Sequence, residues 1–431
     1  AAVKVGDLVA GDFFGETALL NNEPRNATVT VSSKMTEVLV LSKADFEMIL
    51  GPLGSQLQSV SREREQKAQE THEQLQSGKG SSSSAETQAR RASQGDLSIL
   101  MKDLNAVCTL GTGTFGRVKL VEHTTTGRTM ALKAMMKTQI IKSHQEKNVV
   151  AEKDILLECD HPFIIKLYRT FQNDNSIFML LELVQGGELW TLLYQNQSAI
   201  PRTKLGGYTN GPAQFYSACV ISCFQHVHSL GVAYRDLKPE NLLLGANGYL
   251  KMVDFGFAKK IPYYKGRVLQ SKSFTLCGTP EYLSPELVLS QGHNQGVDWW
   301  ALGILIYELL VGETPFADRR QNKIFEKIIH SAEHLKFGRD FPSDARDLVV
   351  KLLHPTLSLR LGLLRGGAED IMNHAWFQNS NFDWNAHASQ QATAPFVPPI
   401  NGKLDTSMFD PYPEDDSVET YRGDQAPFET F

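Results

Sequence analysis

A run of glycines with strand-forming residues on both sides constrains this fold more than any other feature of the sequence. Residues 111–118 read Gly-Thr-Gly-Thr-Phe-Gly-Arg-Val, and the apolar stretches 107–110 and 118–122 flank the glycines. Glycine lets backbone N–H groups approach a phosphate closely. A dinucleotide-binding fold would place a helix directly after such a run. The second strand-like stretch instead predicts a hairpin that lies over phosphates.

A lysine interrupts the next apolar stretch, residues 129–135, which we expect to be a strand. Lys133 is costly to bury there unless it has an anionic partner. Glu152, within the expected helix 147–157, is the proposed partner. The alternative is a surface lysine whose ammonium reaches outward into solvent.

Two polar segments further along the chain have the spacing of a phosphoryl-transfer site. Residues 234–241 read Tyr-Arg-Asp-Leu-Lys-Pro-Glu-Asn, and an Asp-Phe-Gly run begins at Asp254. Asp236 and Asn241 have the spacing at which Asp orients a substrate hydroxyl and Asn holds a metal. Asp254 can hold magnesium against phosphates. Each segment alone could be a polar turn, but the ordered series, which ends with Ser-Pro-Glu at 284–286, is highly specific.

These motifs make residues 104–377 resemble a eukaryotic protein kinase catalytic domain, and more narrowly the cyclic-nucleotide-dependent members of the AGC group. The runs at 257–259, 276–282, 298–303, 405–410 and 428–431 match that group as well. The resemblance implies an α+β fold: a fragment of a cyclic-nucleotide-binding β-roll, then a two-lobed kinase with an AGC C-terminal tail. The terminal aromatic residues are expected to dock into the small lobe. A nucleotide-binding pseudokinase scaffold is the alternative, and the intact catalytic residues argue against it.

The resemblance also implies a role for each matched residue in an ATP and magnesium site. Lys133, paired with Glu152, would contact the α- and β-phosphates; Asp236 would accept the proton, with Lys238 near the γ-phosphate; Asn241 and Asp254 would hold two magnesium ions. The residues expected around ATP are Leu110, Gly111, Gly113, Thr114, Phe115, Gly116, Val118, Ala131, Leu181, Glu182, Val184, Glu188, Leu243 and Phe409. Arg235 would pair with a phosphorylated Thr275 in the activation segment.

Three glutamates match positions that face substrate arginines in basophilic kinases of this group. Glu188, Glu240 and Glu308 together predict protein substrates of the form Arg-Arg-x-Ser/Thr. Lys238 disfavours tyrosine as the acceptor, by family resemblance. The chain carries such a sequence itself, Arg-Arg-Ala-Ser at 90–93. Ser93 is therefore a second expected phosphorylation site, in an autophosphorylated or autoinhibitory segment; the alternative is a basic patch in a linker.

The N-terminal residues 14–29 resemble the phosphate-binding cassette of cyclic-nucleotide-binding domains. Gly15, Glu16, Ala18, Arg25, Asn26 and Ala27 would bind the nucleotide, with Arg25 on the phosphate and Glu16 on the ribose. The alternative is a turn-rich β segment with a satisfied Arg–Glu pair. Asn26 favours cGMP as regulator but leaves cAMP open. Fusion of such a module to a kinase is similar to the cGMP-dependent protein kinases; the rival is a constitutively active or cAMP-regulated kinase with a non-functional sensor fragment.

Composition divides the chain into four segments. We expect the C-terminal part of a cyclic-nucleotide-binding domain with a trailing helix (1–76), a Gly/Ser-rich flexible linker (77–103), the kinase domain (104–377) and the tail (378–431). The net charge of −5 argues against a general polyanion-binding surface, so we expect no nucleic-acid partner. No stretch is apolar enough to span a bilayer. Five scattered cysteines indicate a reducing, cytoplasmic setting, with Cys219 and Cys223 as core thiols. A dimer formed through sequence upstream of Ala1 is compatible with this organisation.

Overall fold

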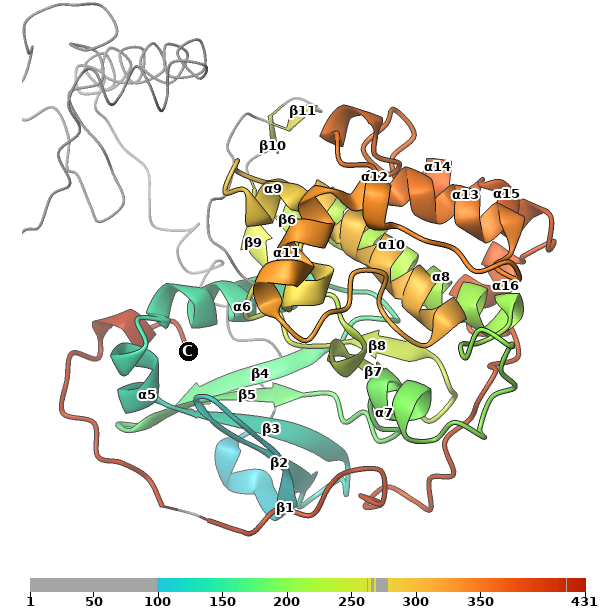
Figure 1. The fold of residues 1–431 in the computed structure, drawn as a ribbon. Coiled ribbons are helices and arrows are strands. Elements are labelled where there is room, and N and C mark those ends of the chain that lie inside the picture. The colour runs from blue at the N-terminus through green and yellow to red at the C-terminus, as the bar shows by residue number, and fades with distance from the viewer. Residues whose placement is uncertain (1–98, 262, 265–266, 269–277, 416) are drawn as a thin grey trace, which may run out of the picture. The chain divides into compact units, whose positions relative to one another are not determined.

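The computed structural model describes residues 99–261, 263–264, 267–268, 278–415 and 417–431. Two units make up the chain, residues 1–85 and 86–431, and every described residue lies in the second unit. That unit has two lobes: a small lobe built on one sheet and a large lobe built mainly of helices (Figure 1). The two-lobed arrangement of helices and strands expected from the sequence is confirmed.

The small lobe is a five-stranded antiparallel sheet with the strand order β1-β2-β3-β5-β4. Its elements are the 3-10 helix η2 (Met101–Asp103), β1 (Leu104–Gly113), β2 (Gly116–His123), β3 (Thr129–Met136), α5 (Lys137–Lys142), α6 (Glu146–Glu158), β4 (Leu167–Gln172) and β5 (Ser176–Leu181). Each strand and helix expected from the apolar stretches around the glycines lies within one of them.

Both faces of this sheet are buried, because the strands alternate between two apolar clusters. Ala131 and Met135 of β3 belong to the main core, whereas Met130 and Leu132 belong to a second cluster on the other face, together with Ile99. Side chains along a strand point to opposite faces in turn. The continuous apolar run of β3 therefore contributes side chains to both clusters. Lys133 is the one charged residue of this strand.

The large lobe is organised around two long helices, α8 (Asn210–Ser229) and α10 (Gly296–Val311), which pack against each other. Residues 296–310 of α10 are all buried, so this helix lies in the centre of the lobe. The remaining helical elements are α7 (Leu189–Tyr194), η3 (Pro239–Asn241), η4 (Pro280–Tyr282), α9 (Pro285–Val288), α11 (Gln321–Ile329), α12 (Ser331–His334), α13 (Ser343–Leu352), η5 (Leu357–Leu359), α14 (Ala368–Met372), α15 (Ala375–Gln378) and α16 (Trp384–Ala388).

Short antiparallel strand pairs lie between the helices of the large lobe. They are β6 (Val232–Ala233) with β9 (Lys259–Lys260), β7 (Leu242–Leu244) with β8 (Leu250–Met252), and β10 (Tyr263–Tyr264) with β11 (Arg267–Val268). The segment 234–241 lies between β6 and β7, and the segment 254–256 lies between β8 and β9. The fold thus brings two of the motifs singled out in the sequence onto neighbouring loops. The activation segment, in which Thr275 is expected, lies partly outside the described residues.

The tail leaves the large lobe and runs along the small lobe to a terminus beside α5 and α6 (Figure 1). It ends in the 3-10 helix η6 (Ala426–Phe428), and Phe428 and Phe431 are both buried. Lys153 of α6 donates to the carbonyl oxygen of Thr430 at 2.8 Å. The expected docking of the terminal aromatic residues on the small lobe is confirmed.

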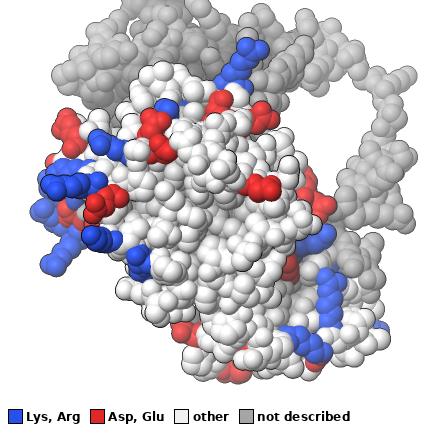
Figure 2. All heavy atoms as spheres, turned by 90° about the vertical axis from the view of Figure 1, so that its right-hand side faces the viewer, with Lys and Arg blue, Asp and Glu red and all other residues white. Residues whose placement is uncertain are grey.

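Two further expectations concern the core and the surface. Cys219 and Cys223 are buried in α8 as free thiols, as expected. On the face of the large lobe shown in Figure 2, basic and acidic side chains lie among each other, and no continuous basic surface extends across it. None of the helices in the described part of the chain is long and apolar enough to cross a membrane.

Candidate active site

The glycine run forms the hairpin predicted from the sequence. Gly113 of β1 pairs with Gly116 of β2, and Thr114 and Phe115 make the turn. A Cβ atom added at Gly113 would meet no atom within 4 Å, whereas one at Gly116 would lie 2.0 Å from the carbonyl oxygen of Ala134. The first glycines therefore leave the backbone open to a ligand, and the last lets β2 pack closely on β3.

The predicted partner of Lys133 is confirmed by the geometry. Lys133 of β3 and Glu152 of α6 form an ion pair, with the Lys133 Nζ atom 2.6 Å from Glu152 Oε1. Burial lowers the pKa of Lys133, but the negative charges of Glu152 and Asp254 outweigh this, so its pKa is raised and the ammonium stays charged. The alternative of a lysine pointing into solvent is wrong. A charged ammonium held in this way can neutralise a phosphate.

Asp236 lies at the centre of a hydrogen-bonded group in the loop after β6. Its Oδ2 atom accepts from Lys238 Nζ at 3.0 Å and from Asn241 Nδ2 at 2.8 Å. Its Oδ1 atom is buried and has no hydrogen-bond partner among the described residues. Asp236 and Thr279 both line a small cavity with room for about one water molecule. One carboxylate oxygen is thus fixed while the other remains available to accept a proton.

Burial sets the basicity of this carboxylate. Desolvation raises the pKa of Asp236, and the Lys238 ammonium with the Asn241 amide acts against that rise. A carboxylate that accepts a proton from a hydroxyl needs these opposing effects on its pKa. If its charged form were strongly stabilised, its pKa would be too low for it to accept the proton.

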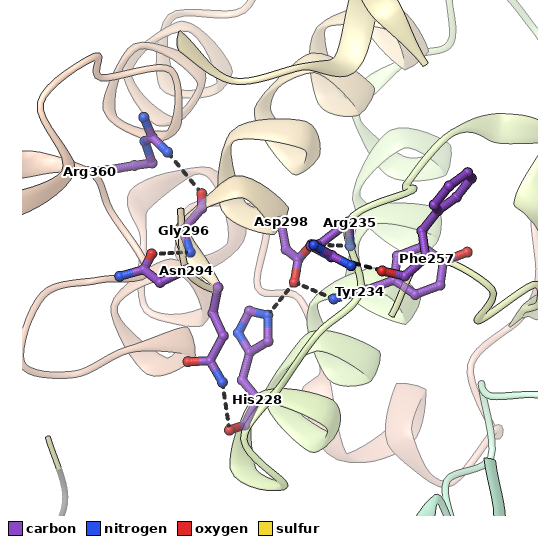
Figure 3. A network of polar contacts seen from close by, with 9 residues as sticks. His228, Tyr234, Arg235, Phe257, Asn294, Gly296, Asp298 and Arg360 are labelled. Carbon is purple, nitrogen blue, oxygen red and sulfur yellow. Dashed lines mark hydrogen bonds and ion pairs between the residues drawn. The ribbon is translucent and has the colours of Figure 1, made fainter. Parts of the chain in front are cut away.

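The backbone of this loop is held by Asp298 of α10, which accepts three hydrogen bonds (Figure 3). The donors are the backbone N–H of Tyr234 at 2.9 Å, that of Arg235 at 2.8 Å and His228 Nε2 at 2.7 Å. Arg235 has a φ angle of 70°, in the left-handed region that non-glycine residues rarely adopt. No role was predicted for Asp298 from the sequence, although a carboxylate in the first turn of a largely apolar helical stretch was the available signal.

The two residues expected to hold magnesium lie on adjoining loops. The backbone N–H of Val253, directly before Asp254, donates to the carbonyl oxygen of Asn241 at 3.0 Å. Asp254 has a φ angle of 55°, and its Oδ1 atom accepts from the backbone N–H of Gly256 at 3.2 Å. Amide and carboxylate oxygens are the ligands that magnesium prefers, completed by phosphates and water. In the described part of the chain no three His, Cys, Asp or Glu side chains gather into a metal site.

The residues expected around adenine line the junction between the lobes. Ala131 and Leu181 are paired neighbours on β3 and β5, and both are buried. Leu110 and Val184 are also buried, and Val118 is paired with Lys133. Ala131 and Leu181 belong to the main core, and Val118 packs against it next to Lys133. The remaining residue of this set, Leu243 of β7, forms a β-bridge with Glu188.

The hinge, residues 182–184, is held from outside by charged and polar groups. Glu182 forms an ion pair with Lys251 of β8, at 2.8 Å between Nζ and Oε2. Gln185 donates to the carbonyl oxygens of Gly402 and Asp405 of the tail, at 3.1 and 2.9 Å. The tail therefore contacts the hinge at Asp405, four residues before Phe409. Phe409 is half-buried, in keeping with its expected place beside adenine.

The three glutamates expected to face substrate arginines have different surroundings. Burial raises the pKa of Glu188, and the nearby Glu240 and Asp410 raise it further. Glu308 of α10 is 3% exposed, and its carboxylate oxygens accept from the hydroxyls of Tyr194 and Tyr282. Burial raises the pKa of Glu308 to about 7. The sequence analysis did not identify the two tyrosines.

Several expected site residues lie outside the described residues. They are Thr275 and Ser93, and the nucleotide-binding set Gly15, Glu16, Ala18, Arg25, Asn26 and Ala27. Arg235, the expected partner of phosphorylated Thr275, donates from Nε to the carbonyl oxygen of Phe257 at 2.8 Å (Figure 3).

A buried ion pair that the sequence analysis missed joins the end of the activation segment to the large lobe. Arg360 donates from its two terminal nitrogens to the two carboxylate oxygens of Glu286, at 2.6 and 2.9 Å, and also to the carbonyl oxygen of Gly296 at 3.0 Å. Both side chains are almost fully buried. This contact fixes the position of the segment that follows Thr279.

Two segments of the chain match known domain families, and almost the whole chain is similar to known protein kinases. The protein kinase domain family matches residues 104–377, and the cyclic nucleotide-binding domain family matches residues 2–51. The chain is 38% identical to cGMP-dependent protein kinase, isozyme 1, of Drosophila melanogaster, covering 95% of this chain and 50% of that protein. It is 36% identical to cGMP-dependent protein kinase 2 of Homo sapiens, covering 94% and 52%.

A third relative, a cAMP-dependent protein kinase, catalytic subunit-like, of Caenorhabditis elegans, is 41% identical over 74% of this chain and 75% of that protein. The chain spans about half the length of the cGMP-dependent relatives. The matched kinase domain covers more than half of the chain, and the Lys133–Glu152 pair, the Asp236 loop and the glycine hairpin all lie within it. The chain therefore belongs to the protein kinase family.

Proposed function

We propose that this chain is a serine/threonine protein kinase that transfers the ATP γ-phosphate, with magnesium, to Ser or Thr in basic sequences, and that cyclic nucleotide, most favourably cGMP, regulates it. The observation that carries the catalytic half is the Lys133–Glu152 ion pair at 2.6 Å beside the Asp236 loop. The match of residues 2–51 to a cyclic nucleotide-binding domain, together with the similarity to cGMP-dependent kinases, supports the regulatory half.

Phosphoryl transfer depends mainly on positioning and on charge neutralisation. Lys133 places a fixed positive charge next to the glycine hairpin, where the phosphates would lie. Asp236 is oriented by Asn241 and Lys238 so that its Oδ1 atom accepts the proton of the substrate hydroxyl. Asn241 and Asp254 would hold magnesium, which neutralises phosphate charge when bound. Asp298 keeps the backbone of the loop in its strained conformation.

The substrate preference rests on the carboxylates of Glu188, Glu240 and Glu308. Burial raises the pKa of Glu188, and the negative charges of Glu240 and Asp410 raise it further, which supports a concentration of negative charge around Glu188. Arginine guanidinium groups pair well with such carboxylates. We therefore propose substrates of the form Arg-Arg-x-Ser/Thr, with Thr275 and Ser93 as phosphorylation sites of the chain itself.

A phosphate-transfer assay on an Arg-Arg-Ala-Ser peptide tests both halves. The chain is assayed with no nucleotide, with cGMP and with cAMP, beside the variants Arg25→Ala and Asp236→Asn. We expect transfer to be stimulated most by cGMP, stimulation to be lost in Arg25→Ala, and transfer to be lost in Asp236→Asn.

Each of the other outcomes favours a named rival. Equal activity with and without nucleotide would favour a constitutively active kinase with a non-functional sensor. Stronger stimulation by cAMP would favour the cAMP-regulated kinase. Nucleotide binding without Asp236-dependent transfer would favour a pseudokinase scaffold.

A further inference from the structure

Two tyrosine hydroxyls occupy the carboxylate of Glu308. Tyr194 of α7 donates to its Oε1 atom, and Tyr282 of η4 donates to its Oε2 atom. Glu308 is also almost fully buried, so solvent barely reaches the carboxylate. A carboxylate that is both occupied and shielded can receive a substrate arginine only after one of these hydroxyls has moved.

Tyr194 is the outer of the two hydroxyl donors. Tyr282 is buried in the core of the large lobe, whereas Tyr194 is half-buried at the C-terminal end of α7. Burial and the negative charge of Glu308 raise the pKa of Tyr194, so its hydroxyl keeps the proton that it donates. An incoming guanidinium group would therefore have to displace Tyr194 rather than Tyr282.

The loop after α7 holds Tyr194 in this position. Arg202 donates to the carbonyl oxygen of Leu193, the residue directly before Tyr194. The same guanidinium group donates to the carbonyl oxygens of Gln197 and Gly206, at 3.2 and 2.7 Å. One side chain thus ties the end of α7 to the loop that follows it.

The same loop is attached to the end of α10, the helix that carries Glu308. The backbone N–H of Tyr208 donates to the carbonyl oxygen of Leu309 at 2.6 Å. A Cβ atom added at Gly207 would lie 2.2 Å from the carbonyl carbon of Leu310, so only glycine lets the loop approach the helix this closely. The loop therefore fixes α7 against α10, with the tyrosine hydroxyl directed at the carboxylate.

The other two glutamates of the proposed substrate site are more open. Glu188 and Glu240 are both half-buried, and neither forms an ion pair within the described part of the chain. An arginine can pair with these carboxylates without displacing another donor. The three glutamates are thus not equivalent, because two are available and one is occupied.

We propose that Tyr194 is a specificity-determining residue: by occupying Glu308 it leaves arginine recognition mainly to Glu188 and Glu240, so that one arginine of Arg-Arg-x-Ser/Thr contributes much less than the other. This inference rests on the proposed function, because it concerns the substrate of the same site. A guanidinium group that reaches Glu308 must break a hydrogen bond to a carboxylate, and such bonds are stronger than those between neutral groups. It must also give up its hydration to enter a buried position.

Phosphate transfer by the full chain, residues 1–431, to three otherwise identical peptides tests the proposal. The peptides contain Arg-Arg-Ala-Ser, Ala-Arg-Ala-Ser or Arg-Ala-Ala-Ser, and the loss in kcat/KM on replacing each arginine is compared. In the wild type we expect one arginine to matter at least about tenfold and the other less than about threefold. Tyr194→Ala opens Glu308, so the weaker arginine should then matter about three to ten times more, while the effect of the stronger one is unchanged. The assays are run at about pH 8, where Glu308 is mainly ionised, since its pKa is about 7.

Two further variants show whether the gain passes through Glu308. Adding Glu308→Gln to Tyr194→Ala should abolish the gain. Trp190→Ala is the matched control, because Trp190 is another half-buried aromatic residue of α7, with its ring 5.6 Å from that of Tyr194; it should leave the arginine preference unchanged. General damage to the fold would lower transfer to all three peptides alike and could not produce the gain.

Binding of the same peptides with Ala in place of Ser, measured by calorimetry, shows the arginine preference without phosphate transfer. Equal contributions of the two arginines in the wild type, or no gain in Tyr194→Ala, would overturn this inference and leave the proposed function standing. A gain that persists with Glu308→Gln, or that Trp190→Ala reproduces, would overturn it as well. The expected pattern in binding, from a chain that transfers no phosphate, would contradict the proposed function and support this inference. A chain that binds none of the peptides would overturn both.

Discussion

Replacing Glu308 by glutamine should make the stability of this protein less dependent on pH. Glu308 is 3% exposed on the central helix α10, with a pKa of about 7 against an ordinary value of 4.5. The folded state therefore holds this proton more tightly than the unfolded chain does. Its contribution is fully present below the unfolded pKa and is lost as the pH rises towards and beyond the folded pKa.

The size of this effect follows from the shift. A difference of roughly 2.5 pKa units corresponds to about 3 kcal/mol at 1.36 kcal/mol per unit. Most of that loss falls between about pH 5 and pH 7.5, where the unfolded carboxyl is ionised and the folded one is becoming so. Glu308→Gln keeps the shape of the side chain and carries no ionisable group.

Urea unfolding followed by tryptophan fluorescence between pH 5 and pH 8 measures the difference, because Trp299 and Trp300 lie on the same helix as Glu308. We expect the free energy of unfolding of Glu308→Gln relative to wild type to rise with pH, by up to about 3 kcal/mol. Glu326→Gln is the control, since Glu326 is an exposed residue paired with Lys323 on α11. Parallel pH profiles for wild type and Glu308→Gln would refute the reasoning.

Three further substitutions probe the catalytic pair, the buried ion pair and the docked tail. Lys133→Met should reduce the rate of phosphate transfer at least about 100-fold while the fold is kept, because it removes a preorganised positive charge. Steady-state kinetics measures the rate, and circular dichroism checks the fold. Substantial residual activity would contradict the prediction. Arg360→Ala should destabilise the chain by about 3–5 kcal/mol, since the carboxylate of Glu286 would remain buried without its partner; a change below about 1 kcal/mol in urea unfolding would argue against the assignment. Phe428→Ala should lower the free energy of unfolding by about 3 kcal/mol, because a fully buried ring is lost. Limited proteolysis should then cleave the tail of the variant. A tail that stays intact under the same protease treatment would contradict this prediction.

The sequence was most informative where a motif consists of neighbouring residues. Three features could be recognised from local sequence: the glycine hairpin, the loop around Asp236 and the strand containing Lys133. Glycine content, the spacing of polar residues and apolar runs are all visible in short stretches of sequence. The pairing of Lys133 with Glu152 was also predicted, since a buried ammonium needs an anion and one helix offered it.

Contacts between distant segments were harder to predict. Two examples are the pairs Glu286–Arg360 and Glu414–Thr109, whose members are far apart in the sequence. The residues around each member do not indicate which residue it contacts. In the sequence, Glu286, Arg360 and Glu414 each look like an ordinary charged surface residue, and Thr109 looks like an ordinary strand residue. Only the packing of the lobes and the course of the tail reveal that they meet.

The sequence by itself determined which groups this protein carries and their order along the chain: the glycine hairpin, Lys133, Asp236, Asn241 and Asp254, to which we assign phosphoryl transfer as a proposal. Tertiary structure decided how these groups are held. Asp298 stabilises the left-handed backbone at Arg235. Desolvation raises the pKa of Glu308 to about 7, against the opposing effect of the hydrogen bonds from Tyr194 and Tyr282. The physical reason is that spacing along a chain specifies which groups exist, whereas desolvation, strain and charge pairing depend on neighbours that only folding brings together.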